Sequence, residues 1–99
     1  MTDTELCFTP ATALAALIRR RKVSPLEVTR AVLARIEKVN PSLNAYCMVA
    51  AEQALEAARR ATAALTRRAT LGLLHGVPVS IMDLTFTKGI RTTEGSKIF

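Results

Sequence analysis

The stretch that decides the fold is His75-Gly76-Val77-Pro78-Val79-Ser80-Ile81-Met82-Asp83-Leu84. Residues 77–82 form a short and mostly apolar run after a glycine-containing connection over residues 72–76, a pattern typical of a buried strand. Beyond Asp83 the composition is that of loop and short strand, punctuated by Gly89 and Gly95. This stretch therefore predicts one strand of a sheet and the turns that enter it.

A first helix is predicted well before that strand. Thr9-Pro10 supplies an N-cap residue followed by proline at the first helical position. The helix predicted over residues 10–21 has an apolar face at three- and four-residue spacing, made of Leu14, Leu17 and Ile18. Cys7 precedes this helix, where we expect it to lie near a mobile chain terminus.

The second helix start carries a stronger signal. Ser24 and Glu27 have the spacing of a capping box, with Pro25 at the first helical position. One stripe of the following helix is apolar, with Leu33 beside it, and consists of Val28, Val32, Ile36 and Val39. Asn40-Pro41 is predicted to end the helix, because a residue before proline disfavours the helical conformation.

The remaining elements alternate between strand and helix. Residues 45–49 predict a short strand, and residues 51–68 an Ala-rich helix whose inner face consists of Ala54, Leu55, Ala58, Thr62 and Leu65. Small residues on that face allow close packing on a sheet. The order helix, helix, strand, helix, strand predicts an α/β fold.

The motif around the last strand is specific. Gly76-Val77-Pro78 and Asp83 are followed at fixed spacing by Lys88-Gly89, Thr92-Thr93 and Gly95-Ser96. This pattern resembles the opening of the core of the amidase signature family, serine hydrolases that cleave carboxylic amides. The resemblance implies a large α/β/α domain on a mixed sheet, incomplete in this chain. Residues 1–99 would form its N-terminal part, mainly helical over 1–70, with the motif in strand and loop over 71–99.

The resemblance also implies a catalytic triad of a serine, a second serine in a cis peptide bond and a lysine, with no metal or organic cofactor. Burial would help the lysine to lose its proton, which it relays through the bridging serine. The lysine position holds Met82, whose thioether has no proton to give. Met82 is thus our one candidate catalytic position, and it is not competent as methionine. The alternative is that Met82 is only a core residue of an apolar strand.

Two further groups of the family's catalytic machinery, the two serines, are absent from residues 1–99. Both serines belong to a Gly/Ser-rich loop downstream of the lysine strand, and the chain stops at Phe99 before it. Ser80 is favoured as a strand residue over a nucleophile, and Lys88 as an exposed turn residue over a displaced lysine. We therefore expect an inactive amidase-family segment. Rival hypotheses are a non-catalytic interaction module and a half-enzyme completed by another polypeptide.

The charge balance bears on partners. The chain has 14 Lys and Arg against 8 Asp and Glu, clustered at residues 19–22, 59–60 and 67–68. A polyanion partner would use such clusters, but nucleic acid is disfavoured because no aromatic residues are interleaved for base stacking. Solvated helix faces and helix C-termini, where cations are favoured, explain the clusters more simply.

The remaining chemistry-bearing residues carry no site of their own. His75 is the only histidine and is expected to hydrogen-bond to backbone, while Cys7 and Cys47 suggest neither a metal site nor a disulfide framework. No apolar run spans a membrane and no secretory signal is recognised, so a cytoplasmic location is expected. The expected partners are a small-molecule amide in the parent family and, through exposed strand edges, further copies of the chain.

Overall fold

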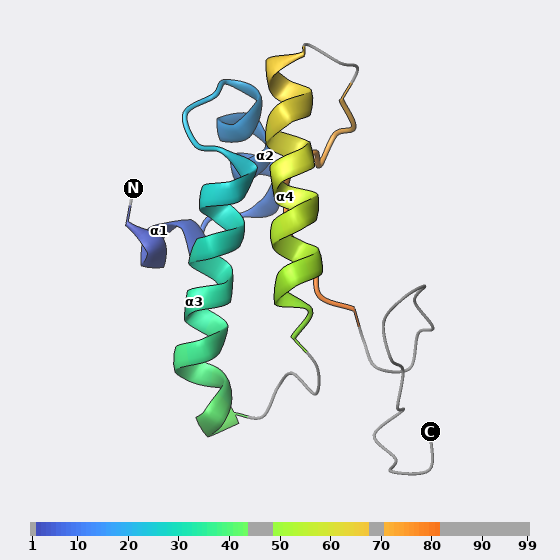
Figure 1. The fold of residues 1–99 in the computed structure, drawn as a ribbon. Helices are drawn as coiled ribbons and strands as arrows, with labels where there is room; N and C mark the ends of the chain where they lie inside the picture. The colour runs from blue at the N-terminus through green and yellow to red at the C-terminus, as the bar shows by residue number, and fades with distance from the viewer. Residues whose placement is uncertain (1, 44–48, 68–70, 82–99) are drawn as a thin grey trace.

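The computed structural model describes residues 2–43, 49–67 and 71–81. Within these ranges the chain forms four helices and no strand: α1 (Asp3–Cys7), α2 (Ala11–Arg19), α3 (Pro25–Leu43) and α4 (Ala51–Thr66). Figure 1 shows α3 and α4 side by side and antiparallel, with α2 near the N-terminal end of α3. The predicted α/β fold class is therefore wrong for the described residues, which are helical. None of these helices is both long and apolar enough to cross a membrane.

Two helices begin at side-chain caps with the same spacing. The backbone N–H of Glu27 donates to Ser24 Oγ over 3.0 Å, which confirms the predicted N-cap of α3. The N–H of Glu5 donates to Thr2 Oγ1 over 3.2 Å and starts α1 in the same way. Helix α1 was not predicted, although Thr2 and Glu5 repeat the spacing of Ser24 and Glu27.

Helix α2 confirms the first predicted helix, with different ends. Its N-cap is Pro10 and not Thr9, whose hydroxyl instead donates to Glu5 O over 2.6 Å. At the other end, the N–H groups of Arg21 and Lys22 donate to Ile18 O and Leu17 O, both over 2.9 Å. This is the bond pattern of a Schellman motif, with Arg21 at φ 60° in the place that glycine usually takes.

Helix α3 continues past the point where it was predicted to end. It includes Asn40 and Pro41 and ends at Leu43. Pro41 has no N–H to donate to the carbonyl of Glu37, but it stands in the last turn of the helix. Glu37 and Pro41 are both exposed. Water can therefore reach that carbonyl, which lowers the penalty that would break a helix in its interior.

The core is aliphatic and joins all four helices. Its buried cluster consists of Leu6, Leu14, Ile18, Val23, Val28, Ala31 and Leu65. Ile18 and Val28 are 1% and 0% exposed, which confirms the apolar faces predicted for α2 and α3. Toward the C-terminal end of α3 the same stripe is only half-buried, at Val32, Ile36 and Val39.

Neither predicted strand is present among the described residues. Residues 45–48 and Met82 lie outside the described ranges, whereas Val49 and residues 77–81 lie within them and form no ladder. A strand needs a neighbouring backbone to bond with, and no described segment pairs with residues 77–81. Val79 and Ile81 are accordingly 82% and 56% exposed.

Candidate functional site

The segment of residues 71–81 leads to the candidate catalytic position and begins with two tight turns. The N–H of His75 donates to Gly72 O over 3.2 Å, and that of Val77 to Leu74 O over 3.0 Å. In the second turn Gly76 has φ 80°, while the φ of His75 is not positive. These signs of φ are those of a type II turn, whose third position needs a positive φ and so favours glycine. The predicted connection over residues 72–76 is confirmed.

Gly76 is also pressed against the helices. A Cβ placed on it would lie 2.6 Å from Pro25 Cγ and 3.4 Å from Ile18 Cδ1. The Pro25 side chain is completely buried at the start of α3, so its ring has little room to withdraw. Glycine at this position is thus required twice, by the backbone conformation and by the close approach to α3.

Two polar contacts fasten the same turns to two different helices. Arg19, at the end of α2, donates from Nη2 to Leu73 O over 3.1 Å. His75 Nε2 lies 2.8 Å from Ala61 O in α4. A carbonyl oxygen only accepts, so Nε2 must carry the proton and donate. The expectation that His75 hydrogen-bonds to backbone is confirmed.

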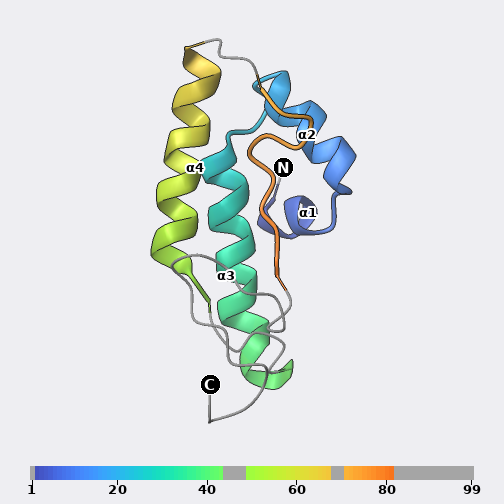
Figure 2. The same cartoon turned by 90° about the vertical axis from the view of Figure 1, so that its right-hand side faces the viewer.

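Beyond the turns the segment runs between α3 on one side and α1 and α2 on the other (Figure 2). Val77 is half-buried against the core cluster, and Ser80 is exposed. A cavity of about 400 Å³ lies between this segment and the helices, with Leu6, Thr29, Val32, Val77 and Ile81 among its lining residues. The described part of the segment ends at Ile81, so Met82, Asp83, Lys88 and Ser96 lie outside the described residues.

Cys7 is held in place, contrary to its predicted location near a mobile terminus. It is the last residue of α1, is half-buried, and donates from Sγ to Ala31 O over 3.5 Å. The guanidinium of Arg35 lies 5.6 Å from the ring centroid of the adjacent Phe8. Both contacts join α1 and its C-cap to α3, so α1 belongs to the packed structure.

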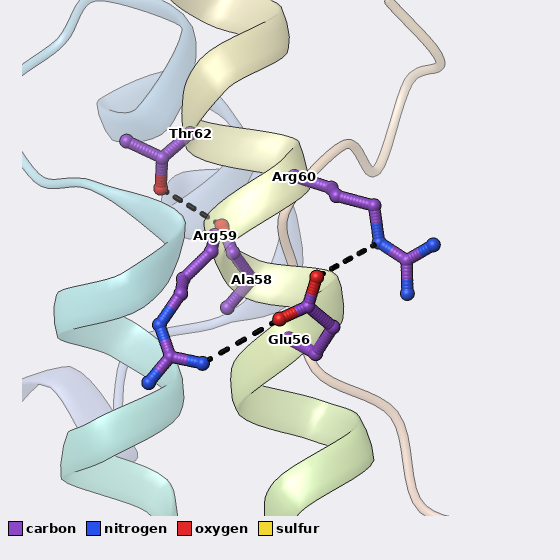
Figure 3. A network of polar contacts seen from close by, with 5 residues as sticks. All are labelled: Glu56, Ala58, Arg59, Arg60 and Thr62. Carbon is purple, nitrogen blue, oxygen red and sulfur yellow. Dashed lines mark hydrogen bonds and ion pairs between the residues drawn. The ribbon is translucent and has the colours of Figure 1, made fainter.

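Residues of the basic clusters at 19–22 and 59–60 make structural contacts. Arg21 Nη2 donates over 2.8 Å to Leu65 O, one of the last carbonyls of α4. Figure 3 shows Arg59 and Arg60 both directed at Glu56, at 3.6 and 3.8 Å, near the hydrogen bond from Thr62 to Ala58. For the clusters at 19–22 and 59–60, these contacts agree with the expectation that the basic residues lie at helix ends and on exposed helix faces; Arg68 lies outside the described residues.

The described residues bring together no group of three or more His, Cys, Asp or Glu side chains that could hold a metal ion. The chemistry-bearing motif is therefore best judged by its relationship to known proteins. The family model named Amidase matches residues 27–99, from the first turn of α3 through the motif. This chain belongs to the amidase family.

Individual relatives of the amidase family agree with this assignment. A putative amidase, AmiD, of Mycobacterium tuberculosis (strain ATCC 25618 / H37Rv) is 44% identical over 88 residues, which are 89% of this chain and 18% of that protein. A glutamyl-tRNA(Gln) amidotransferase subunit of Moorella thermoacetica is 44% identical over 94 residues, 95% of this chain and 19% of the relative. Its counterpart in Acidothermus cellulolyticus is 49% identical over 88 residues, 89% of this chain and 17% of the relative.

The chain thus spans less than a fifth of the length of these amidase-family relatives. No solved structure matches it.

Within the amidase-family motif, the structure gives a physical reason for one residue that the sequence pattern identified without a reason. Gly76 is the glycine of Gly76-Val77-Pro78, and its contact with Pro25 gives it a packing role. The contacts of Arg19 and Arg21 were missed, because their partners lie 54 and 44 residues away along the chain. No local signal pairs an arginine with a carbonyl at that separation; only the position of both arginines after an apolar face hinted at a helix end.

Proposed function

We propose that residues 1–99 are the N-terminal part of a single amidase signature domain, in a protein that hydrolyses the C–N bond of a carboxylic amide. The observation that carries the proposal is the family match over residues 27–99, supported by 44% identity to a putative amidase over 88 residues. The relatives include both a putative amidase and amidotransferase subunits, so we propose an amide substrate and no narrower class.

In this proposal the helices serve as a support for the segment that leads to the lysine position. Hydrogen bonds from α2 and to α4 hold the turns of residues 72–76, and Gly76 packs against α3. Ile81 directly precedes Met82, the position that we assign to the lysine of the family triad. A methionine there cannot exchange a proton with a bridging serine. We infer that residues 1–99 are catalytically inert as they stand.

A hybrid enzyme tests the assignment. Residues 1–99 replace the aligned segment of the Mycobacterium tuberculosis putative amidase, in one version with Met82 and in another with Met82→Lys. Hydrolysis of a nitroanilide is followed by absorbance, with the unaltered host as the positive control. We expect the Met82→Lys hybrid to be active and the Met82 hybrid to be about 10²–10⁴-fold slower, the usual range for loss of an acid–base group.

Equal activity of the two hybrids would show that position 82 is not the lysine position. Residues 1–99 alone, carrying Met82→Lys, provide the matched control. They should release no nitroaniline, because no Gly/Ser-rich loop lies within them. Stoichiometric hydrolysis by this control would contradict our assignment of the catalytic groups. The expected self-association and cytoplasmic location stay predictions.

A further inference from the structure

The turns that begin the segment of residues 71–81 are held by long-range polar contacts in addition to the packing of Leu71, Gly76 and Val77 on the helices. Leu73 and Leu74 are 84% and 57% exposed, so their side chains contribute little to holding the chain on the helices. The backbone carbonyl of Leu73 and the side chain of His75 make the long-range hydrogen bonds instead. Donors in particular places therefore contribute to the attachment of these turns, between the packed residues on either side of them.

The two hydrogen bonds come from separate helices and hold points two residues apart. Arg19 reaches Leu73 O from the end of α2, whereas His75 reaches Ala61 O within α4. Inside a helix a carbonyl also accepts from the N–H four residues on, so His75 uses the second lone pair of Ala61 O. Contacts to two helices restrict both the position and the rotation of the turns between them.

The position of the turns affects the position of the residues that follow them in the chain. Val77 follows Gly76 directly and packs against the core cluster, and only four further residues separate it from Met82. Met82 is joined directly to Ile81, with the two Cα atoms about 3.8 Å apart across a trans peptide, so a displacement of the segment up to Ile81 would be passed on to position 82. Misplacement of a reacting group by as little as 1 Å is enough to slow catalysis severely.

We propose that Arg19 and His75 are positioning residues, which fasten the turns of residues 72–76 to α2 and α4 and thereby set the location of position 82. This inference rests on the proposed function, because it gives position 82 a catalytic meaning. Neither side chain is assigned any contact with substrate. The physical attachment itself can be tested independently of activity.

Hydrogen exchange on the 99-residue chain tests the attachment. The reporters are the amides of residues 75 and 77, which donate to Gly72 O and Leu74 O. Arg19→Ala and His75→Ala should each speed exchange at these amides about tenfold, as loss of one hydrogen bond predicts. Amides in α4 serve as the internal reference and should keep the exchange rates of the unsubstituted chain.

Two variants make the exchange test specific. His75→Gln can still donate an N–H to Ala61 O and should recover slow exchange to within about threefold. Arg20→Ala removes an exposed neighbouring arginine with no side-chain hydrogen bond or ion pair shown to any described residue, and should change nothing. Unchanged exchange in Arg19→Ala and His75→Ala would overturn the proposal. Equal acceleration in α4 would also overturn it, because it would indicate loss of the whole fold.

The Met82→Lys hybrid supplies the catalytic readout. His75→Ala in that hybrid should lower kcat about tenfold with KM within about twofold, because the loss concerns placement of the reacting group. His75→Gln should restore kcat. An active hybrid that is insensitive to His75→Ala would overturn the positioning role while leaving the proposed function intact. An inactive Met82→Lys hybrid, with the predicted exchange pattern, would refute the proposed function and the catalytic meaning of the contacts, leaving only the attachment.

Discussion

The helices and the segment of residues 71–81 are stabilised in opposite ways. The longer helices α2, α3 and α4 satisfy most of their backbone by bonds between residues four apart. Residues 77–81 form no ladder with another described segment, and the turns before them receive hydrogen bonds that join them to Arg19 and Ala61, 54 and 14 residues away from their partners. The apolar composition of residues 77–82 predicted a strand, but composition supplies no neighbour to bond with.

This difference shows which local signals can be trusted in the chain. A capping residue such as Ser24 acts on the N–H of Glu27, three positions away, so sequence alone is sufficient to locate it. The extended segment has no equivalent local rule, because its conformation depends on what lies beside it. Substitutions where the segment contacts the helices can therefore show whether a contact stabilises the helices, the segment or both.

The largest effect is expected at a residue that both regions share. Ile18 is 1% exposed in the core, and its Cδ1 also approaches Gly76. Ile18→Ala should lower the free energy of unfolding by about 2–5 kcal/mol and loosen helices and segment together. Urea unfolding followed by circular dichroism measures the loss, with Thr12→Ala on the exposed face of α2 as the control. A loss below about 1 kcal/mol would contradict the position of Ile18 in the core.

A smaller and more selective effect is expected at Gly76. Gly76→Ala would force a side chain into the left-handed region, at about 1–2 kcal/mol, and against the buried Pro25 ring. We expect the segment to detach, with faster amide exchange at residues 75 and 77, while the helical circular dichroism signal stays. Gly72→Ala is the matched control, because a Cβ there meets nothing within 4 Å. Similar exchange in the two variants would refute the close approach to Pro25.

The smallest effect concerns a long-range contact within the helical region. Arg21→Ala and Arg21→Gly both remove the hydrogen bond to Leu65 O, but only glycine relieves the φ of 60°. Arg21→Gly should therefore be more stable than Arg21→Ala by about 1 kcal/mol in the free energy of unfolding. The comparison uses thermal or urea unfolding of both variants. Equal stability would show that the residue at position 21 does not hold the left-handed conformation.

Sequence reasoning succeeded where a signal and its effect lie within a few residues. It located α3 from Ser24 and Glu27, and the apolar faces around Ile18 and Val28. It missed α1, although Thr2 and Glu5 have the same N-cap spacing as Ser24 and Glu27. It ended α3 early, because the bias before Pro41 is weaker in an exposed last turn than in a helix interior.

The sequence by itself determined most helix starts, the aliphatic faces and the motif that places the chain in the amidase family. Only the tertiary structure decided that Gly76 meets Pro25, that Arg21 caps α4, and that residues 77–81 form no ladder among the described residues. The physical reason is the range of the interactions. Caps and helical bonds join near neighbours in the chain, whereas packing contacts and strand pairing join residues that only the arrangement of the helices brings together.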